Sequence, residues 1–519
     1  MKVTRQIGLI VGKIMINVLL LSITFILSGT EAGAILFILI LIGYCVLFIL
    51  SLAGLIKGQS RLLKMTSRTR LFSRLVSTFI TSLLLILTFS GGYYIAEELD
   101  LTPSDKITRL HRAFFSNEDD ILAFTQDYPQ LEADHIMFRY HPDTETAVTD
   151  MIVLMEAVEE LEKEIYGQTI EKVEPLEVLV LKDSNDYFTL NRDYQSADKG
   201  LYDSRYKRAM IHQGDNIDSD NFYITETFIH EYSHYLFDLY LEQEELNKHE
   251  VPVWYDEGIA EFMSNRILSA RYLPGEESFE LSFLDLHTHT GWDRAMATEP
   301  VYHQAFMGVE YIVGSGGHAS ILSEILLKQK EMDKFSDAFA ETTGFELAGF
   351  NEELTVMTQD LATARNTWAI EKDFDKAQAL YGEILDRVPS HSQVWFDYAL
   401  MNEENLDWEP ALTARRELVR VAPDASSFID LSYLLVLTDA QEALEMAREA
   451  LRYAEWQPYG DLAFFEEWVE EVELYQELMS EDNRVEAYDT LIHGEHLLYM
   501  PGIINELDNM KQALVNQPL

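Results

Sequence analysis

The sequence predicts an α+β protein built in three parts: three transmembrane helices, then a mixed sheet with helices, then an all-α helical repeat region. Three observations predict this arrangement. Long apolar runs are confined to the first 96 residues, strand-like and helix-like segments alternate through the middle, and the C-terminal third has a helical pattern that repeats. We place the parts at residues 1–96, 97–355 and 356–519.

The N-terminal part is basic and apolar, whereas the rest of the chain is strongly acidic. Residues 1–96 contain nine Lys or Arg and a single acid, Glu31, although the whole chain carries a net charge of −49. Three apolar runs, at about 7–28, 33–56 and 75–96, are each long enough for a helix to cross the roughly 30 Å hydrocarbon layer. A cleaved signal peptide is the alternative for the first run.

The basic residues also predict an orientation. The 57–74 loop has six Lys or Arg and no acid, and such loops stay in the cytoplasm. Residues 97–519 are therefore expected outside the cell membrane, whether or not the first run is retained. The single cysteine, Cys45, lies in the second run, so the outer part forms no disulfide, as in many extracytoplasmic proteins of bacteria. Its acidic charge argues against a nucleic-acid partner.

The middle of the chain alternates between strand-like and helical patterns. Segments 134–139 and 176–181 have the short, β-branched or aromatic composition of strands, and a further strand is expected near 200–212. Apolar residues recur at helical spacing over 145–166. A second helix is expected from about 225 to 242, and it carries the residues with recognisable chemistry.

That helix contains His230-Glu231-Tyr232-Ser233-His234, an H-E-x-x-H motif. The four-residue spacing places both imidazoles on one helix face, where they can bind one metal ion, and Glu231 lies close enough to act on a metal-bound water. A pair of surface or core histidines is the alternative. Polar neighbours such as Thr225 and Asp238 place the helix in water rather than inside a membrane.

A second segment, Trp254-Tyr255-Asp256-Glu257-Gly258-Ile259-Ala260-Glu261, follows a predicted loop. A catalytic zinc needs a third protein ligand and one open position, and Glu257 fits the role of that ligand. Glu261 lies one turn later on the same helix face, where it could accept the free N–H of a ligating histidine. The alternative makes both glutamates solvated helix residues.

With these two motifs, residues 130–355 resemble the gluzincin clan of metallopeptidases, specifically the peptidase MA-like metallohydrolases. The resemblance implies that His230, His234 and Glu257 bind Zn²⁺, that Glu231 is the general base and that Glu261 supports a ligand. It implies a peptide or protein as substrate and the strand near 200–212 as the edge along which it lies.

The same resemblance points to Tyr302, in Tyr302-His303-Gln304 before an apolar helix, as a donor to the transition state. No Gly-x-Met-x-Asn segment of the kind that holds a substrate amine in aminopeptidases of the clan is visible, which favours endopeptidase action. His287-Thr288-His289 could be read as a second metal site, but it lacks a companion cluster of acids. His135 and His212 are expected to be packed or surface residues.

Past residue 355 the pattern becomes helical and repeats. Asp373-Phe374, Ala377 and Pro389 recur 34 residues later as Asp407-Trp408, Ala411 and Pro423, which is the period of the tetratricopeptide repeat. Such helix pairs stack into a curved array whose concave face can hold a peptide or a partner helix. A plain helical bundle that covers the preceding domain is the alternative.

Two functions from different classes fit the sequence. The first is a membrane-anchored zinc endopeptidase that acts on extracytoplasmic proteins, with the repeats recruiting a substrate or partner. The second is a non-catalytic envelope scaffold that binds partners through its repeats and has a structural or vestigial metal site. Glu231 favours the enzyme, because a structural site needs no base and usually has four protein ligands. A transporter fits poorly, since the three spans contain no intramembrane acid and no interrupted helix that would suggest a substrate path.

Overall fold

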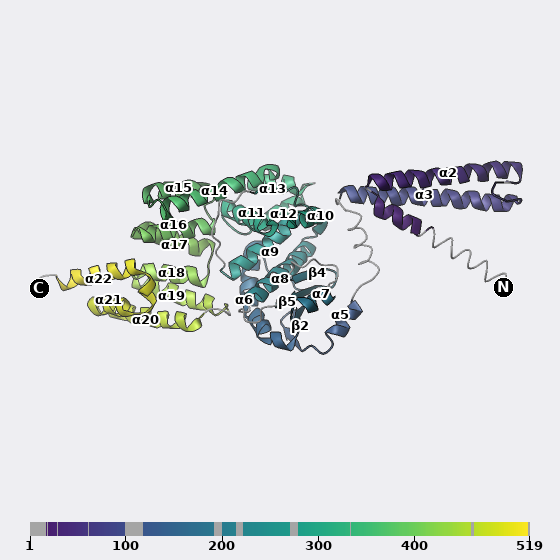
Figure 1. Cartoon of the computed structure of the whole chain (residues 1–519). Coiled ribbons are helices and arrows are strands. Elements are labelled where there is room, and N and C mark those ends of the chain that lie inside the picture. Colours follow the sequence, from purple (N-terminus) through teal and green to yellow (C-terminus); the bar gives the residue numbers. More distant parts are fainter. Residues whose placement is uncertain are drawn as a thin grey trace. The chain divides into compact units, whose positions relative to one another are not determined.

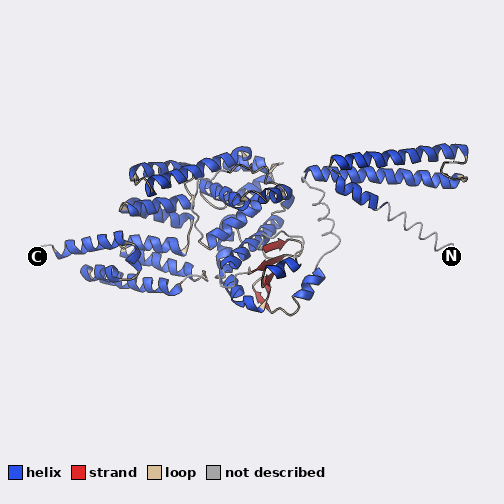
Figure 2. Ribbon diagram, in the orientation of Figure 1, coloured by secondary structure: helices blue, strands red, loops and turns tan. Residues whose placement is uncertain are grey.

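The computed structural model describes residues 17, 19–28, 30–60, 62–98, 118–190, 200–213, 222–269, 279–332, 334–457 and 461–516. The chain forms two compact units, Met1–Asp119 with Thr288–Arg294, and Asp120–His287 with Ala295–Leu519. Figure 1 labels the elements along the chain, and Figure 2 shows that the strands gather in one place among many helices. The α+β class is therefore confirmed, with one five-stranded sheet.

Two long apolar helices make up most of the described part of the first unit. They are α2 (Glu31–Lys57) and α3 (Arg68–Glu98), and they pack against each other with the rings of Phe37 and Phe89 stacked 4.2 Å apart. By length and composition both can cross a membrane. The described residues thus contain two such helices rather than the three predicted, since half of the first predicted run, 7–28, lies outside them.

The sheet has the strand order β1-β2-β3-β5-β4. The central strands β2, β3 and β5 are parallel, and the edge strands β1 and β4 pair antiparallel to their neighbours. β3 is almost wholly buried, as its aliphatic sequence requires for a strand covered on both faces. The strands are β1 (Gln130–Ala133), β2 (Ile136–Tyr140), β3 (Leu176–Leu181), β4 (Gly200–Asp203) and β5 (Arg208–His212).

Two of the predicted elements in this region have the predicted bounds, namely β3 and α6 (Glu145–Tyr166). The strand predicted near 200–212 is instead a hairpin, because Lys207 adopts a left-handed backbone with φ 46° and Asp203 accepts a hydrogen bond from Arg205 N in the turn. β2 begins only at Ile136, because Asp134 turns the chain back from β1 with φ 49°.

Three helices of this unit position the candidate site. α8 (Phe222–Gln243) is buried along most of its length and packs against β4, β5 and α9 (Val253–Ile267). α9 also packs closely against α11 (Val301–Gly316), since a β-carbon at Gly258 would lie only 2.7 Å from Ala305 O. The remaining helices before α14 are α5 (Glu118–Phe124), α7 (Ser184–Leu190), α10 (His289–Met296), α12 (Ile321–Gln329) and α13 (Phe335–Thr343).

Helices α14 to α22 follow one another, and each packs against the next. We call them the helical array. The predicted division after residue 355 falls inside α14. The helices are α14 (Phe350–Ala369), α15 (Phe374–Arg387), α16 (Ser392–Glu404), α17 (Trp408–Val421), α18 (Ala425–Leu435), α19 (Ala440–Ala454), α20 (Leu462–Ser480), α21 (Arg484–His493) and α22 (Pro501–Val515).

The sequence repeat corresponds to a repeated backbone. α15 and α17 begin 34 residues apart, and Ala377 and Ala411 are fully buried at equivalent positions. Two residues before each of these helices, Lys372 and Leu406 have left-handed backbones with φ 58° and 60°, and Asp482 before α21 has φ 59°. The same tight turn therefore starts three of the helices in the array.

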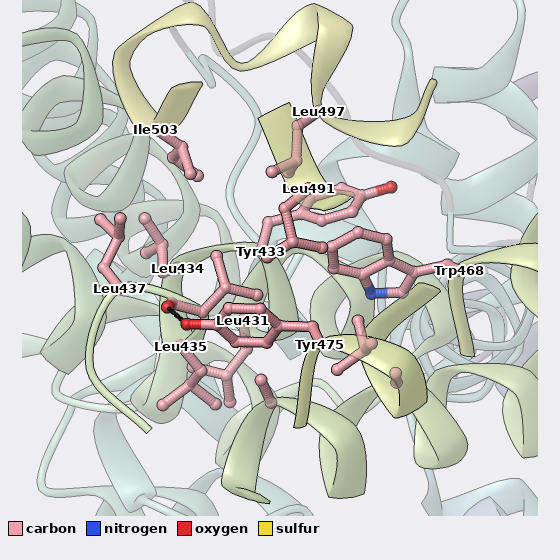
Figure 3. Packing of buried hydrophobic residues seen from close by; sticks show 14 of the residues in the cluster. Leu431, Tyr433, Leu434, Leu435, Leu437, Trp468, Tyr475, Leu491, Leu497 and Ile503 are labelled. Atoms are coloured by element: carbon pink, nitrogen blue, oxygen red, sulfur yellow. Dashed lines mark hydrogen bonds between the residues drawn. The ribbon is translucent and has the colours of Figure 1, made fainter. Parts of the chain in front are cut away.

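A continuous apolar core joins α18 to α22 (Figure 3). Trp468 on α20 is fully buried and donates a hydrogen bond from Nε1 to Ser432 Oγ on α18 at 2.9 Å. Tyr475, about two turns further along α20, donates a hydrogen bond from its hydroxyl to Val436 O at 2.7 Å. Both aromatic side chains thus bury their rings and satisfy their polar atoms, which fixes α20 against α18.

The connection between α15 and α16 lies directly on α11. Ser390 N donates to Gly314 O at 2.9 Å, and Ser392 Oγ donates to Glu310 Oε1 at 2.6 Å. Between them His391 is fully buried against Gly314, where a β-carbon would lie 3.1 Å from His391 Cβ. The array is therefore joined to α11 by hydrogen bonds and close packing.

The buried His391 predicts a pH dependence of stability. Burial lowers its pKa, Glu310 only partly offsets this effect, and both ring nitrogens lack a hydrogen-bond partner among the described residues. The folded state therefore keeps His391 neutral, while the unfolded chain takes up a proton below about pH 6.5. As the pH falls below that value, protonation stabilises the unfolded chain and the free energy of unfolding decreases. Between pH 7.5 and 5.5 the wild type should lose up to about 1.4 kcal/mol relative to His391→Leu.

This difference can be measured by urea denaturation of both proteins at the two pH values. His493→Leu is the matched control, because that side chain is 78% exposed and should show no such difference. Equal pH slopes for the wild type and His391→Leu would contradict the assignment.

Candidate metal site

The two histidines of the H-E-x-x-H motif face each other across one turn of α8. The Nε2 atoms of His230 and His234 are 3.2 Å apart, and their side chains are only 14% and 10% exposed. Residues four apart lie on one helix face, and the packing of α8 against α9 encloses that face. The two nitrogens therefore point to a common place.

Glu257, in the first turns of α9, brings a carboxylate to the same place. Its Oε2 lies 3.2 Å from His230 Nε2 and 3.5 Å from His234 Nε2, and these three residues form a possible metal-binding group. Tetrahedral zinc with bonds of about 2.0–2.1 Å requires ligand atoms about 3.3–3.4 Å apart. The spacing and the donor types thus fit a zinc site with three protein ligands.

Two further carboxylates hold the outer nitrogens of the imidazoles. Glu261 Oε1 lies 3.2 Å from His230 Nδ1, and its role in holding a metal ligand stays a prediction. Asp256 Oδ1 lies 2.7 Å from His234 Nδ1, a contact that the sequence interpretation missed although the residue adjoins Glu257. Lys248 lies behind Asp256, with its Nζ 3.6 Å from Oδ2, and also pairs with Asp238. Each imidazole is therefore fixed in orientation with Nε2 free to bind a metal.

The charges of the group favour a divalent cation. Burial by itself lowers the pKa of His230, but hydrogen bonds to Glu257 and Glu261 outweigh it and raise the pKa to about 10. Burial is likewise outweighed at His234, whose pKa is raised by the charges of Asp256 and Glu257. Burial raises the pKa of Glu257, but the two imidazoles hold it well below its usual value. A divalent cation displaces the imidazole protons, and the three carboxylates then outnumber the one cation beside them, Lys248, which leaves excess negative charge in a buried place.

Glu231, the predicted base, is buried at 6% exposure between α8 and the edge strand β4. A β-carbon at Gly200, the first residue of β4, would lie 2.6 Å from Glu231 Oε1. Any larger residue at this position would displace either the carboxylate or the strand. Gly200 therefore lets the free edge of the sheet pass close to Glu231.

Tyr302, at the start of α11, lies beside the cluster. Its ring centroid is 6.0 Å from that of His230, and the two rings are tilted by 61°. The structure thus brings the predicted hydrogen-bond donor next to a predicted metal ligand from a helix that is distant in sequence.

The other histidines considered in the sequence lie elsewhere. His135 contacts Tyr232 OH through Nε2 at 2.7 Å and Asp134 through Nδ1, so both nitrogens already have partners, although Asp134, His135 and Glu159 form a second possible metal-binding group. His212 is 9% exposed and packs against Tyr187. Both are packed residues, as expected.

Replacing Asp256 by alanine is expected to weaken zinc binding by about 10–100-fold, because His234 loses the carboxylate that fixes its ring and tautomer. The zinc dissociation constant can be measured by competition with a chromophoric chelator. Asp285→Ala is a matched control in an exposed position. Unchanged affinity in Asp256→Ala would show that the orientation of His234 is fixed by other contacts.

Comparison with known proteins places the site within a region of recognisable similarity. Residues 167–346 match the family model of Peptidase M9, collagenase. The uncharacterized protein YhcO of Bacillus subtilis (strain 168) is 30% identical over 128 residues, which are 24% of this chain and 38% of YhcO. The chain thus matches well under half of that relative.

The collagenase family differs from the peptidase MA-like metallohydrolases that the motifs resemble, but both are zinc metallopeptidases. The matched region extends from the start of the loop before β3 to the end of α13, and it contains all the candidate ligands as well as Glu231 and Tyr302. Residues 167–346 are thus similar in sequence to the collagenase family of zinc-dependent peptidases, and they contain the candidate ligand group.

Proposed function

We propose that this protein is a membrane-anchored zinc endopeptidase that hydrolyses peptide bonds of extracytoplasmic proteins or peptides. The observation that carries the proposal is the three-donor group of His230, His234 and Glu257, whose mutual distances of 3.2 to 3.5 Å fit zinc, inside the region that matches a peptidase family. Three ligands leave a fourth position open for reactants, which is typical of catalytic zinc.

The proposed mechanism assigns a role to each residue around that position. Zinc, when bound, supplies the Lewis acidity that acidifies the attacking water and polarises the scissile carbonyl. Glu231 accepts the proton of the water and later delivers it to the leaving nitrogen. The Tyr302 hydroxyl donates a hydrogen bond to the oxyanion as it forms. Glu261 and Asp256 keep the imidazoles in the tautomer that leaves Nε2 unprotonated.

The position of the peptide substrate follows from the sheet. β4 is an edge strand, so one side of its backbone is available for pairing with an extended peptide. Since Gly200 of this strand lies against Glu231, a peptide bound along β4 would pass the proposed base. We therefore propose that substrates bind as an added strand, which suits cleavage inside a chain rather than at its end.

The membrane part would anchor the enzyme with its catalytic part outside the cell. α2 and α3 are long and apolar enough to span a membrane. The last residue of α2, the connection and the first turns of α3 together carry the six basic residues of segment 57–74. We propose that this connection is cytoplasmic and that residues 97–355 and 356–519 form extracytoplasmic catalytic and repeat domains.

The helical array would recruit a protein partner or substrate. Its repeated 34-residue spacing and repeated left-handed turns at Lys372 and Leu406 fit tetratricopeptide-like helix pairs. The same feature is the basis for the second candidate function, a partner-binding scaffold without catalysis. The burial of Glu231, which adjoins the candidate ligand His230 in the sequence, favours the enzyme, because a scaffold has no use for a base there.

The experiment that tests the proposal is incubation of the purified full-length protein with peptides derived from a whole proteome, followed by mass spectrometry of the products. Cleavage that stops on addition of a zinc chelator and returns with zinc is expected. Absence of cleavage by a protein that does contain zinc would favour the scaffold.

A further inference from the structure

A cavity of about 390 Å³ lies away from the candidate metal group, where α6 and the C-terminal end of α9 face the helical array. This volume is within the range of pockets that bind small ligands. Arg266, which lines the cavity, is nine residues after Glu257 on α9, about 14 Å along the helix. The lining also includes Leu161, Asp424, Tyr453, Trp456 and Gln457.

Arg266 is the lining residue whose guanidinium lacks hydrogen bonds to the described residues. Its side chain is only 11% exposed, and its guanidinium lies over the ring of Phe262 at 5.4 Å. The nearest carboxylate oxygen, on Glu164, is 4.0 Å away, which is beyond a hydrogen bond. Within the part of the chain that the structure describes, no hydrogen bond from this guanidinium is present. The Arg266 guanidinium therefore lines the cavity at low exposure, with no hydrogen-bond acceptor among the described residues.

The acids that line the cavity are already engaged. Glu160 pairs with Lys163 at 3.1 Å. Asp424 is 4% exposed and accepts a hydrogen bond from Ser427 N at 2.6 Å, which caps α18. Among the described acids that line the cavity, only Glu164, which is 45% exposed, lies close to Arg266. The negative charges at the wall thus do not supply the missing acceptor.

The two aromatic residues that line the cavity, Tyr453 and Trp456, already contact a cationic side chain. The guanidinium of Arg452 lies 4.6 Å from the ring centroid of Tyr453 and 5.0 Å from that of Trp456, and Arg452 pairs with Glu449 at 2.7 Å. A cationic ligand would compete with Arg452 for these rings and would be repelled by Arg266. An anionic ligand with an apolar part meets neither obstacle.

We propose that this cavity binds a carboxylate attached to an aromatic or aliphatic group, as found at the C-terminus of a peptide or in a free aromatic acid. Arg266 binds the carboxylate through two parallel N–H groups, the geometry that a guanidinium fork favours. Leu161, Tyr453 and Trp456 contact the apolar part. Because Gln457 Nε2 donates to Ser269 Oγ at 2.8 Å, just beyond α9, the bound group bridges two segments that are already joined at the rim.

The experiment is isothermal titration calorimetry of the full-length protein in detergent with four probes. They are N-acetyl-Leu-Phe, its C-terminal amide, phenylpropionate and phenethylamine. Both carboxylates are expected to bind, and the tighter of the two identifies a peptide terminus or a free acid as the source. The amide and the amine are expected to bind at least about tenfold more weakly, because they lack the charge that the fork requires. Equal binding of the amide, or tighter binding of the amine, would overturn the proposal.

Variants separate this cavity from the metal group. Arg266→Gln should weaken carboxylate binding at least about tenfold. Glu164→Gln should tighten it at least about twofold, because a negative charge that repels the ligand carboxylate is removed. Arg448→Gln, an exposed arginine of α19 that pairs with Glu473, is the matched control and should bind as the wild type does. If Arg266→Gln does not fold, the direction of the change in Glu164→Gln decides, and weaker binding in that variant would contradict the proposal.

Glu257→Ala, which breaks the candidate metal group, should leave carboxylate binding unchanged. Loss of binding in that variant would show that the probes bind at the metal instead, and the proposal for the cavity would then be wrong. Since none of the candidate metal ligands lines the cavity, the proposal for the cavity can be right or wrong independently of the proposed hydrolysis.

Discussion

Glu231→Gln is expected to lower peptide hydrolysis by about 10²–10⁴-fold while the protein keeps its zinc. The amide has nearly the same shape as the carboxylate, but it cannot accept the proton of the attacking water. Glu231 stands outside the group of His230, His234 and Glu257, so its replacement leaves the ligands in place. The two quantities to measure are kcat on a cleaved peptide and zinc content by elemental analysis.

Glu242→Gln is the control for this variant, because Glu242 is a 61% exposed residue near the end of the same helix. Full activity in Glu231→Gln would mean that another group acts as the base. Loss of zinc together with activity would mean that Glu231 supports the metal rather than the proton transfer.

The second large effect is expected on metal content. Wild-type protein should contain about one zinc per chain, and His230→Ala or Glu257→Ala should contain almost none, because two remaining ligands hold zinc weakly. Hydrolysis should be lost in parallel. Glu250→Ala, in the exposed connection before α9, is the control and should keep its zinc.

The zinc contents of the wild type and of these variants also distinguish the two candidate functions. A wild-type protein without zinc, even after incubation with the metal, would rule out the peptidase and leave the scaffold. Zinc retained in Glu257→Ala would show that a different residue completes the ligand set, and the group in the structure would then be an incidental cluster.

The features that local sequence determines were predictable. The H-E-x-x-H spacing places His230 and His234 on one helix face in any α-helix, and the short β-branched run at 176–181 predicted a strand. The position of Glu257 required one further assumption, that the helix after the loop packs back on the first. The structure has that packing.

Features that depend on tertiary contacts were not predictable from one sequence. Asp256 adjoins Glu257, but nothing local shows that its carboxylate reaches His234 rather than solvent. The hairpin at 200–212 depends on the left-handed backbone of Lys207, a residue type that usually avoids it. The cavity at Arg266 brings together segments up to 300 residues apart, from Ala157 to Gln457, and no pattern within any one segment signals it.

The hydrogen bonds that join the start of α16 to α11 affect how the peptidase-like region can be produced alone. A fragment that stops at residue 355 would end inside α14 and would remove Ser392, the hydroxyl that satisfies the buried carboxylate of Glu310. It would also uncover the backbone of Gly314. Such a fragment would lack these hydrogen bonds and would expose a face of α11 that is buried in the whole protein, so the smallest self-sufficient piece must extend at least to α16.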